Sequence, residues 1–130
     1  MCLELVLCDK KYWEFVRKLR NNKKTSTGFI ENTIITAKEQ KEYMKINSKN
    51  YRIALYNKKA VGYIGVINND IRICTHPDYQ RKGIGKFMIL ECLKIWPKAQ
   101  GKIKIDNLSS IKLFESCGFK KQFYLFTNDN

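Results

Sequence analysis

The stretch CTHPDYQRKGIG, residues 74–85, leads from a β-prone segment through a basic turn into a helical segment. Amides at the N-terminus of a helix have no partner inside the helix and attract anions. The two glycines let the backbone approach a ligand, and Arg81, Lys82 and Lys86 add positive charge. The stretch therefore predicts a site for two phosphate groups. Taken alone, it would also suit a tightly packed strand–turn–helix junction without a ligand.

Two better-known phosphate motifs are excluded at this place. A Walker loop requires glycine where Gln80 stands and serine or threonine where Phe87 stands. A dinucleotide-binding fingerprint requires glycine in place of Met88.

Upstream of this stretch, three β-prone segments follow one another: YRIALYN (51–57), AVGYIGVI (60–67) and DIRICT (70–75). They are separated by Asn57-Lys58-Lys59 and by Asn68-Asn69, which suit tight turns. This pattern predicts an antiparallel meander of three strands.

The N-terminal part predicts a strand over Leu3 to Leu7 and then a helix that Asp9 caps and Asn21-Asn22 end. Its apolar residues have helical spacing: Tyr12, Phe15, Val16 and Leu19. The tetrad Thr36-Ala37-Lys38-Glu39 matches a capping box and predicts a second helix to about Asn47. Residues 23–35 give no clear pattern.

Downstream, the apolar spacing becomes helical from Gly83 until Trp96-Pro97 stops it. A strand KIKID (102–106) follows, then a short helix to Ser116 capped by Asn107 or Ser109. Gly118 suits the end of that helix, and residues 119–127 predict a last strand. The expected order is βααβββαβαβ.

Composition narrows the class of protein. A chain of 130 residues suits one domain, 1–130, and no apolar run approaches the ~20 residues that a membrane span needs. The N-terminus does not resemble a secretion signal, so we expect a cytoplasmic protein. Five scattered cysteines without C-x-x-C spacing predict neither a structural metal site nor a disulfide framework.

Two motifs carry a resemblance to a known family. Gln80 to Gly85 match the signature Q/R-x-x-G-x-G/A of the GNAT superfamily of acyl-CoA N-acyltransferases, and Pro77 also fits. A second family element is matched by five residues: Asn107, Ser110, Phe114, Gly118 and Phe119. The expected order of elements also resembles that family over nearly the whole chain.

The resemblance implies an α+β fold, a three-layer α/β/α sandwich with a mixed, mostly antiparallel twisted sheet of about six strands and about four helices. The fourth and fifth strands would splay apart, and the pantetheine arm of acetyl-CoA would enter the gap like an extra strand. The backbone of Ile73 to Thr75 would then bond the pantetheine amides. Pyrophosphate would lie on the amides from Arg81 to Lys86. Asn107 would lie near the pantetheine arm, and it also suits a helix cap. The implied cofactor-binding residues are Ile73, Cys74, Thr75, Gln80, Arg81, Lys82, Gly83, Ile84, Gly85, Lys86, Asn107, Ser110 and Phe114.

The catalytic residues remain unassigned. Many relatives have tyrosine where Phe114 stands, and its phenol is thought to protonate the departing thiolate, which phenylalanine cannot do. An amine with a pKa near ~10 must also lose a proton before it attacks a thioester. Four residues are candidates for the base, each with a structural alternative: Glu31, Asp70, His76 and Asp106.

The resemblance implies direct transfer of an acetyl group from acetyl-CoA to a primary amine of a small molecule in a ternary complex. Leu19-Arg20-Asn21 with Phe29, and the segment 110–114, look similar to transferases that act on amino sugars of surface polysaccharide. An amino acid, a polyamine, an antibiotic or a protein N-terminus are the alternatives. We expect a monomer or a homodimer, no metal and no membrane.

The net charge of +13 is spread along the chain. Such a charge favours polyanionic partners without identifying one. A non-catalytic module that binds nucleic acid, with a vestigial acyl-CoA cleft, is therefore the alternative function. The basic residues do not interleave with aromatic residues in an RNA-binding motif, so we do not expect nucleic acid.

Overall fold

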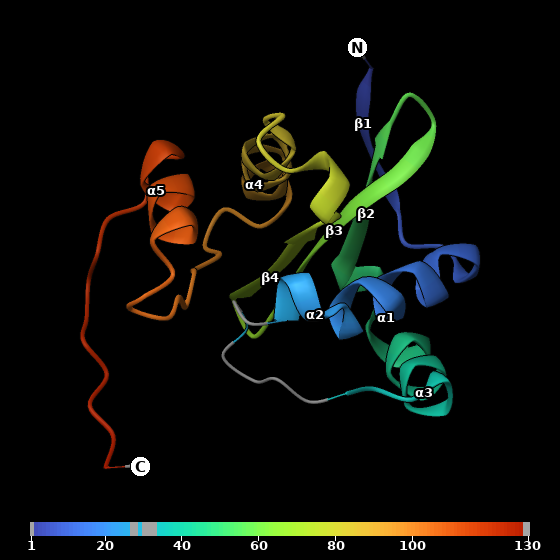
Figure 1. Ribbon diagram of the computed structural model, residues 1–130, viewed down its shortest axis with the longest axis horizontal. Helices are drawn as coiled ribbons and strands as arrows, with labels where there is room; N and C mark the ends of the chain where they lie inside the picture. Colours follow the sequence, from blue (N-terminus) through green and yellow to red (C-terminus); the bar gives the residue numbers. More distant parts are fainter. Residues whose placement is uncertain (1, 27–28, 30–33, 129–130) are drawn as a thin grey trace.

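The computed structural model describes residues 2–26, 29 and 34–128. Its centre is an antiparallel sheet of four strands in the order β1-β2-β3-β4 (Figure 1). The strands are β1 (Leu3–Leu7), β2 (Tyr51–Tyr56), β3 (Lys59–Ile67) and β4 (Asp70–Thr75). The helices are α1 (Trp13–Asn21), α2 (Lys23–Ser26), α3 (Ala37–Asn47), α4 (Ile84–Ile95) and α5 (Leu108–Ser116).

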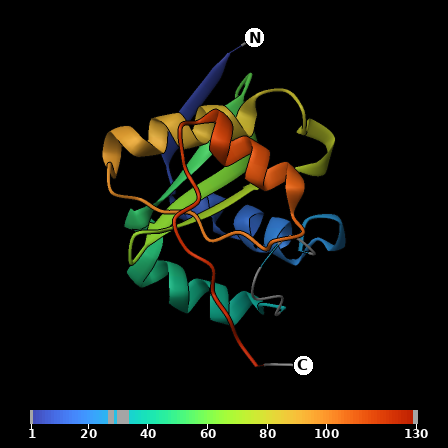
Figure 2. The same ribbon diagram turned by 90° about the vertical axis from the view of Figure 1, so that its left-hand side faces the viewer.

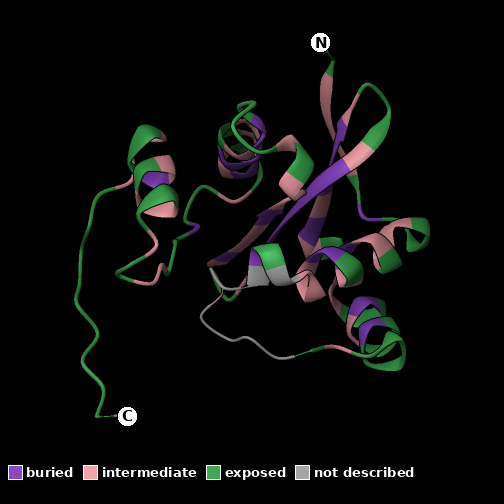
Figure 3. Ribbon diagram, viewed as in Figure 1, coloured by how far each residue is buried: buried purple, intermediate pink, exposed green. Residues whose placement is uncertain are grey.

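Helices cover both faces of the sheet, as the three-layer prediction requires. In Figure 1, α4 and α5 lie on one side of the strands, and α1, α2 and α3 lie on the other. On the first face, Met88 of α4 packs in one apolar cluster with Ile64 of β3. On the second, Leu19 and Met44 pack with Ile53 of β2. Figure 3 shows the buried residues concentrated on the strands and on the sides of the helices that face them.

The predicted meander is confirmed. The turn between β2 and β3 has positive φ at Asn57 (48°) and Lys58 (71°). The turn between β3 and β4 has positive φ at Asn68 (52°) and Asn69 (64°). Positive φ at both central residues is what a type I′ hairpin turn requires, and asparagine tolerates it better than most residues.

The capping box is also present. Thr36 Oγ1 accepts a hydrogen bond from the Glu39 amide at 3.2 Å, and Glu39 Oε1 accepts one from the Thr36 amide at 3.0 Å. The start of α1 differs from the prediction. Asp9 makes no side-chain cap, because residues 10–12 first form a 3₁₀ turn, and α1 begins at Trp13.

Two predicted strands are wrong. Residues 102–106 and 119–127 form no β-ladder within the described chain, so the sheet has four strands rather than six. The one parallel pairing among the described residues is a single bridge between Asp70 of β4 and Gln100. Beyond this bridge, no strand of the described part of the chain lies beside residues 102–106, and a β-prone sequence without a partner makes no ladder.

The β-prone segment after α5, at the end of the described chain, also has no neighbouring strand and forms no ladder. Figure 2, which views the molecule from the side of α5, shows this segment extending past the sheet toward the C-terminus. Its apolar residues are largely exposed, from 81% at Tyr124 to 93% at Phe123. Among the described residues, no helix is long and apolar enough to cross a membrane.

Candidate functional site

A cavity of about 770 Å³ opens beside β4. It is lined by β4, the loop and first turn of α4, residues 102–107, α5, and parts of α1 and α2. Twelve of the thirteen predicted cofactor-binding residues line it, and Lys82 does not. The fold thus brings together residues that lie up to 41 positions apart, from Ile73 to Phe114.

The outer edge of β4 presents backbone groups to this cavity. The Ile71 amide donates outward to the Gln100 carbonyl at 2.8 Å. Backbone hydrogen-bonding directions alternate along a strand, so Ile73 and Thr75 also point their amides and carbonyls outward. Cys74 lies between them and directs its backbone groups to β3. Of the three residues predicted to bond the pantetheine amides, Ile73 and Thr75 therefore have the suitable orientation.

The N-terminus of α4 supplies the predicted anion site. Gly83 is the N-cap, with a φ of 79° that favours glycine. The first bond of the helix runs from the Phe87 amide to the Gly83 carbonyl, at 3.0 Å. The amides of Ile84, Gly85 and Lys86 precede this bond, so none of them has an acceptor within the helix. All three residues line the cavity.

Asn107 caps α5, as one of its two predicted roles requires. Its Oδ1 accepts hydrogen bonds from the Ser110 amide and from Ser109 Oγ, both at 3.2 Å. Phe114, on the same helix, is 6% exposed, and its ring meets that of Phe119 edge-on with centroids 5.1 Å apart. Phe114 therefore both fills the core and lines the cavity.

The candidate bases differ in whether they line the larger cavity. Asp70 lines the cavity; its Oδ2 pairs with Arg72 Nε at 3.2 Å, and its buried Oδ1 has no hydrogen-bond partner among the described residues. His76 accepts a hydrogen bond from the Asp78 amide at 3.1 Å and so shapes the turn before α4. His76 and Asp106 do not line the cavity, and Glu31 lies outside the described residues.

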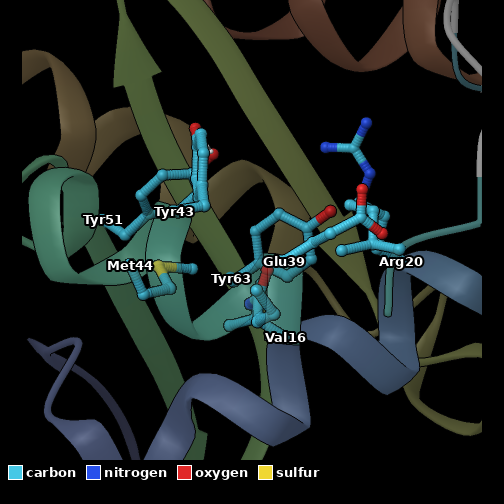
Figure 4. A pocket seen from close by; sticks show the side chains of 9 residues that line it. Val16, Arg20, Glu39, Tyr43, Met44, Tyr51 and Tyr63 are labelled. Carbon is cyan, nitrogen blue, oxygen red and sulfur yellow. Dashed lines mark hydrogen bonds between the residues drawn. The ribbon is translucent and has the colours of Figure 1, made fainter. Parts of the chain in front are cut away.

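A second cavity, of about 270 Å³, lies on the other face of the sheet. Side chains from α1, α3, β2 and β3 surround it (Figure 4). Arg20 and Tyr63 line both cavities, so the two cavities adjoin at these residues. Sequence reasoning does not find Tyr63, because a tyrosine in an apolar strand looks like an ordinary core residue. In the sequence, Arg20 and Phe29 stand out only as parts of a short motif; Phe29 lines the larger cavity.

Tyr51 and Tyr63, two tyrosines of the second cavity, are protonated at neutral pH. Burial raises the pKa of Tyr63 well above its usual range, and the charges of Arg20 and Arg72 oppose this only in part. Burial also raises the pKa of Tyr51, whose hydroxyl lies 2.8 Å from that of Tyr43. The phenols of Tyr51 and Tyr63 can therefore donate and accept hydrogen bonds but cannot serve as bases.

The family follows from the segment that carries this geometry. A family model described as an acetyltransferase (GNAT) domain matches residues 47–121, which run from before β2 to beyond α5. The chain belongs to this GNAT family. It is therefore an acyl-CoA-dependent N-acetyltransferase, and acetyl-CoA is its co-substrate. The open edge of β4 and the free amides of α4 fit a ligand that has both amide and phosphate groups. Within the described residues, no cluster of side chains could hold a metal ion.

Solved structures share the fold of this GNAT acetyltransferase at low sequence identity. A spermidine N-acetyltransferase from Vibrio cholerae, in complex with CoA and spermine, has a TM-score of 0.80 at 20% identity, over 95% of this chain and 83% of that chain. A putative acetyltransferase from Salmonella typhimurium, with acetyl-CoA, has a TM-score of 0.76 at 14% identity, over 92% and 80%. AAC(6')-Iy, in complex with the bisubstrate analogue CoA-S-monomethyl-acetylneamine, has a TM-score of 0.72 at 14% identity, over 100% and 99%. A search of curated proteins finds no match.

Proposed function

We propose that this enzyme acetylates the primary amine of a small molecule, with an amino sugar as the candidate acceptor, by direct transfer in a ternary complex. The observation that carries the proposal is the junction of the two cavities at Arg20 and Tyr63. Acetyl-CoA would bind in the larger cavity beside β4, and the acceptor would enter from the face of α1 and α3. The amine and the thioester would then meet without an acyl-enzyme intermediate.

We assign the cofactor contacts as follows. The backbones of Ile73 and Thr75 would bond the pantetheine amides, and the amides of residues 84–86 would bind the pyrophosphate. Ser110 and Phe114 would line the thiol end. The other predicted contacts that line this cavity are assigned to the same ligand: Cys74, Gln80, Arg81, Gly83 and Asn107. Lys82 does not line the cavity, so we assign it no contact.

The choice of a small amine is supported by the bound states of similar folds. The Vibrio cholerae enzyme is a spermidine N-acetyltransferase with spermine bound, and AAC(6')-Iy holds an analogue that contains acetylneamine. Here Arg20 and Phe29, which resemble a motif of amino-sugar transferases, both line the larger cavity. A sugar also suits a site lined by phenols and a guanidinium, since its hydroxyls can hydrogen-bond to both.

The test is a steady-state assay of thiol release from acetyl-CoA over a panel of amino sugars, amino acids and polyamines. Direct transfer predicts initial-velocity lines that intersect when both substrates are varied. It also predicts no mass increase when the protein is incubated with acetyl-CoA alone. Parallel lines together with an acetylated protein would contradict direct transfer. Thiol release that depends on a protein N-terminus and on no small amine would contradict the acceptor class.

A further inference from the structure

Among the described residues, no carboxylate forms a salt bridge with Arg20. This arginine stands near the end of α1, and its buried Nε has no hydrogen-bond partner among the described residues. Two nearby arginines are paired with carboxylates. On α1, Arg17 Nε lies 2.9 Å from a carboxylate oxygen of Glu14, and on β4, Arg72 Nε lies 3.2 Å from Asp70 Oδ2. A buried guanidinium donor without an acceptor is destabilising, so the position suits an acceptor brought by a ligand.

Most of the other polar side chains of the smaller cavity already have hydrogen-bond partners. Glu39 accepts from the Thr36 amide within the capping box, and Gln40 Nε2 donates to the Trp13 carbonyl at 2.9 Å. Figure 4 shows the guanidinium of Arg20 at one end of the pocket and the mutually bonded Tyr43 and Tyr51 at the other. Arg20 is therefore the charged donor that this cavity offers to a ligand.

The larger cavity is also lined mainly by positive charges, which favour an anionic ligand. Six cationic residues and one carboxylate line it, and that carboxylate, Asp70, is already paired with Arg72. Arg81 and Lys86 stand in the loop and first turn of α4, where the cofactor phosphates are assigned. The remaining cations stand on α1, α2, β4 and the segment after α4: Arg20, Lys24, Arg72 and Lys102.

We propose that the acceptor amine carries an anionic group, a carboxylate or a phosphate, that Arg20 binds where the two cavities meet. This inference rests on the proposed function and narrows its substrate class. A guanidinium matches either anion with paired hydrogen bonds. A polyamine would instead bring further positive charge beside Arg20 and Lys24, which is unfavourable in a partly buried site.

Matched acceptors test this inference. One pair is glucosamine and glucosamine phosphorylated on its primary hydroxyl; the other is γ-aminobutyramide and γ-aminobutyrate. Within each pair the amine is the same and only the distant anionic group differs, so the pairs separate a phosphate from a carboxylate. Spermidine serves as the polycationic acceptor. Two measurements are made: kcat/KM for thiol release, and calorimetric binding to protein saturated with CoA, which keeps the phosphate loop occupied.

We expect the anionic member of at least one pair to be preferred by about tenfold or more, as charge-assisted hydrogen bonds are worth. Arg20→Gln should remove most of this preference by raising KM for the anionic member and leaving the neutral member nearly unchanged. Arg20→Lys should keep part of it, because the charge remains. Lys18→Gln is the matched control: Lys18 is exposed on the same helix and lines neither cavity. Thermal unfolding checks that each variant is folded.

The outcomes distinguish this inference from the function on which it rests. Equal use of both members of each pair, a preference for spermidine, or an equal loss for both members in Arg20→Gln would overturn the anionic acceptor and leave acetylation intact. Absence of binding by both anionic compounds would also overturn it. Binding of an anionic amine that depends on Arg20, without transfer to any amine, would support the anion site and contradict the proposed function.

Discussion

Gly85→Glu tests the assignment of phosphates to the start of α4, because it places a carboxylate among the amides. A Cβ at Gly85 would lie 3.0 Å from Leu113 Cδ2, the end of a flexible side chain, and farther from any other atom. A negative charge in the first turn of a helix is worth about 0.3–1 kcal/mol in favour of the helix, and replacing glycine in a helix adds roughly 0.5–1 kcal/mol. These two effects together favour the folded state by up to about 2 kcal/mol, and displacement of Leu113 opposes them, so we expect the free protein to stay folded, with a free energy of unfolding no more than about 1 kcal/mol below that of the wild type.

When acetyl-CoA is bound, the glutamate charge becomes unfavourable, because it lies beside the phosphates. Two unit charges 4 Å apart repel by about 4 kcal/mol at an effective dielectric constant of 20, and this site faces more than one phosphate charge. Allowing for solvent screening, we expect at least about 2.7 kcal/mol, or a hundredfold weaker binding. Gly85→Gln is the matched control, since it has the same size and no charge. It should weaken binding less than Gly85→Glu does.

Calorimetry at low and high salt measures both variants, with circular dichroism to check the fold. The difference in affinity for acetyl-CoA between Gly85→Glu and Gly85→Gln should narrow as salt rises, because repulsion at an open cavity is screened. Wild-type affinity in a folded Gly85→Glu protein would refute the placement of phosphate at these amides. Equal losses for Glu and Gln would show that the effect is steric, and the charge argument would then fail.

Three further predictions concern the core around the site. Phe114→Tyr should fold and should keep or modestly raise turnover; a severe loss in a folded variant would show that an apolar ring is required there. Gly101→Ala should destabilise the protein by about 1–3 kcal/mol in urea unfolding, because its Cβ would overlap the Phe114 ring. The free energy of unfolding should fall as pH rises above 9.0, because burial raises the pKa of Cys8 and Cys74 to about 12 and that of Cys92 to about 11, so the unfolded chain loses these protons first. Stability that rises between pH 9 and about 11 in stepped-pH urea unfolding would contradict this linkage.

The elements that sequence predicts well are those whose cause is local. The Thr36–Glu39 capping box joins residues three positions apart, and the Asn68-Asn69 turn depends on the backbone preferences of its own residues. The loop 80–85 is likewise contiguous, so its motif could be recognised without the fold. In each case the sequence contains every group that takes part.

The errors concern partners that are distant in the chain. Residues 102–106 and 119–127 have β-prone sequences, but a strand forms only where another strand pairs with it. The outer edge of β4 makes one bridge and otherwise lines the cavity. The acceptor side was missed for a related reason. Arg20 and Tyr63 are 43 positions apart, and only the packing of α1 on β3 brings them to the same junction.

The burial of Phe114 also bears on how this enzyme handles protons. A residue that fills the core against Phe119 is held by packing, and its ring offers no proton to the thiolate. A thiolate is a modestly basic leaving group, since thiols of cysteine type have a pKa near ~8.5, so it needs little help from an acid. The larger demand is deprotonation of the amine, whose pKa in water is near ~10. Burial and neighbouring cations both favour the neutral form of an amine, and the larger cavity, where the thioester is assigned, is lined by Lys24, Arg72 and Lys102 besides Arg20. We therefore expect the surroundings of the acceptor to contribute more to catalysis than an acid at position 114 would.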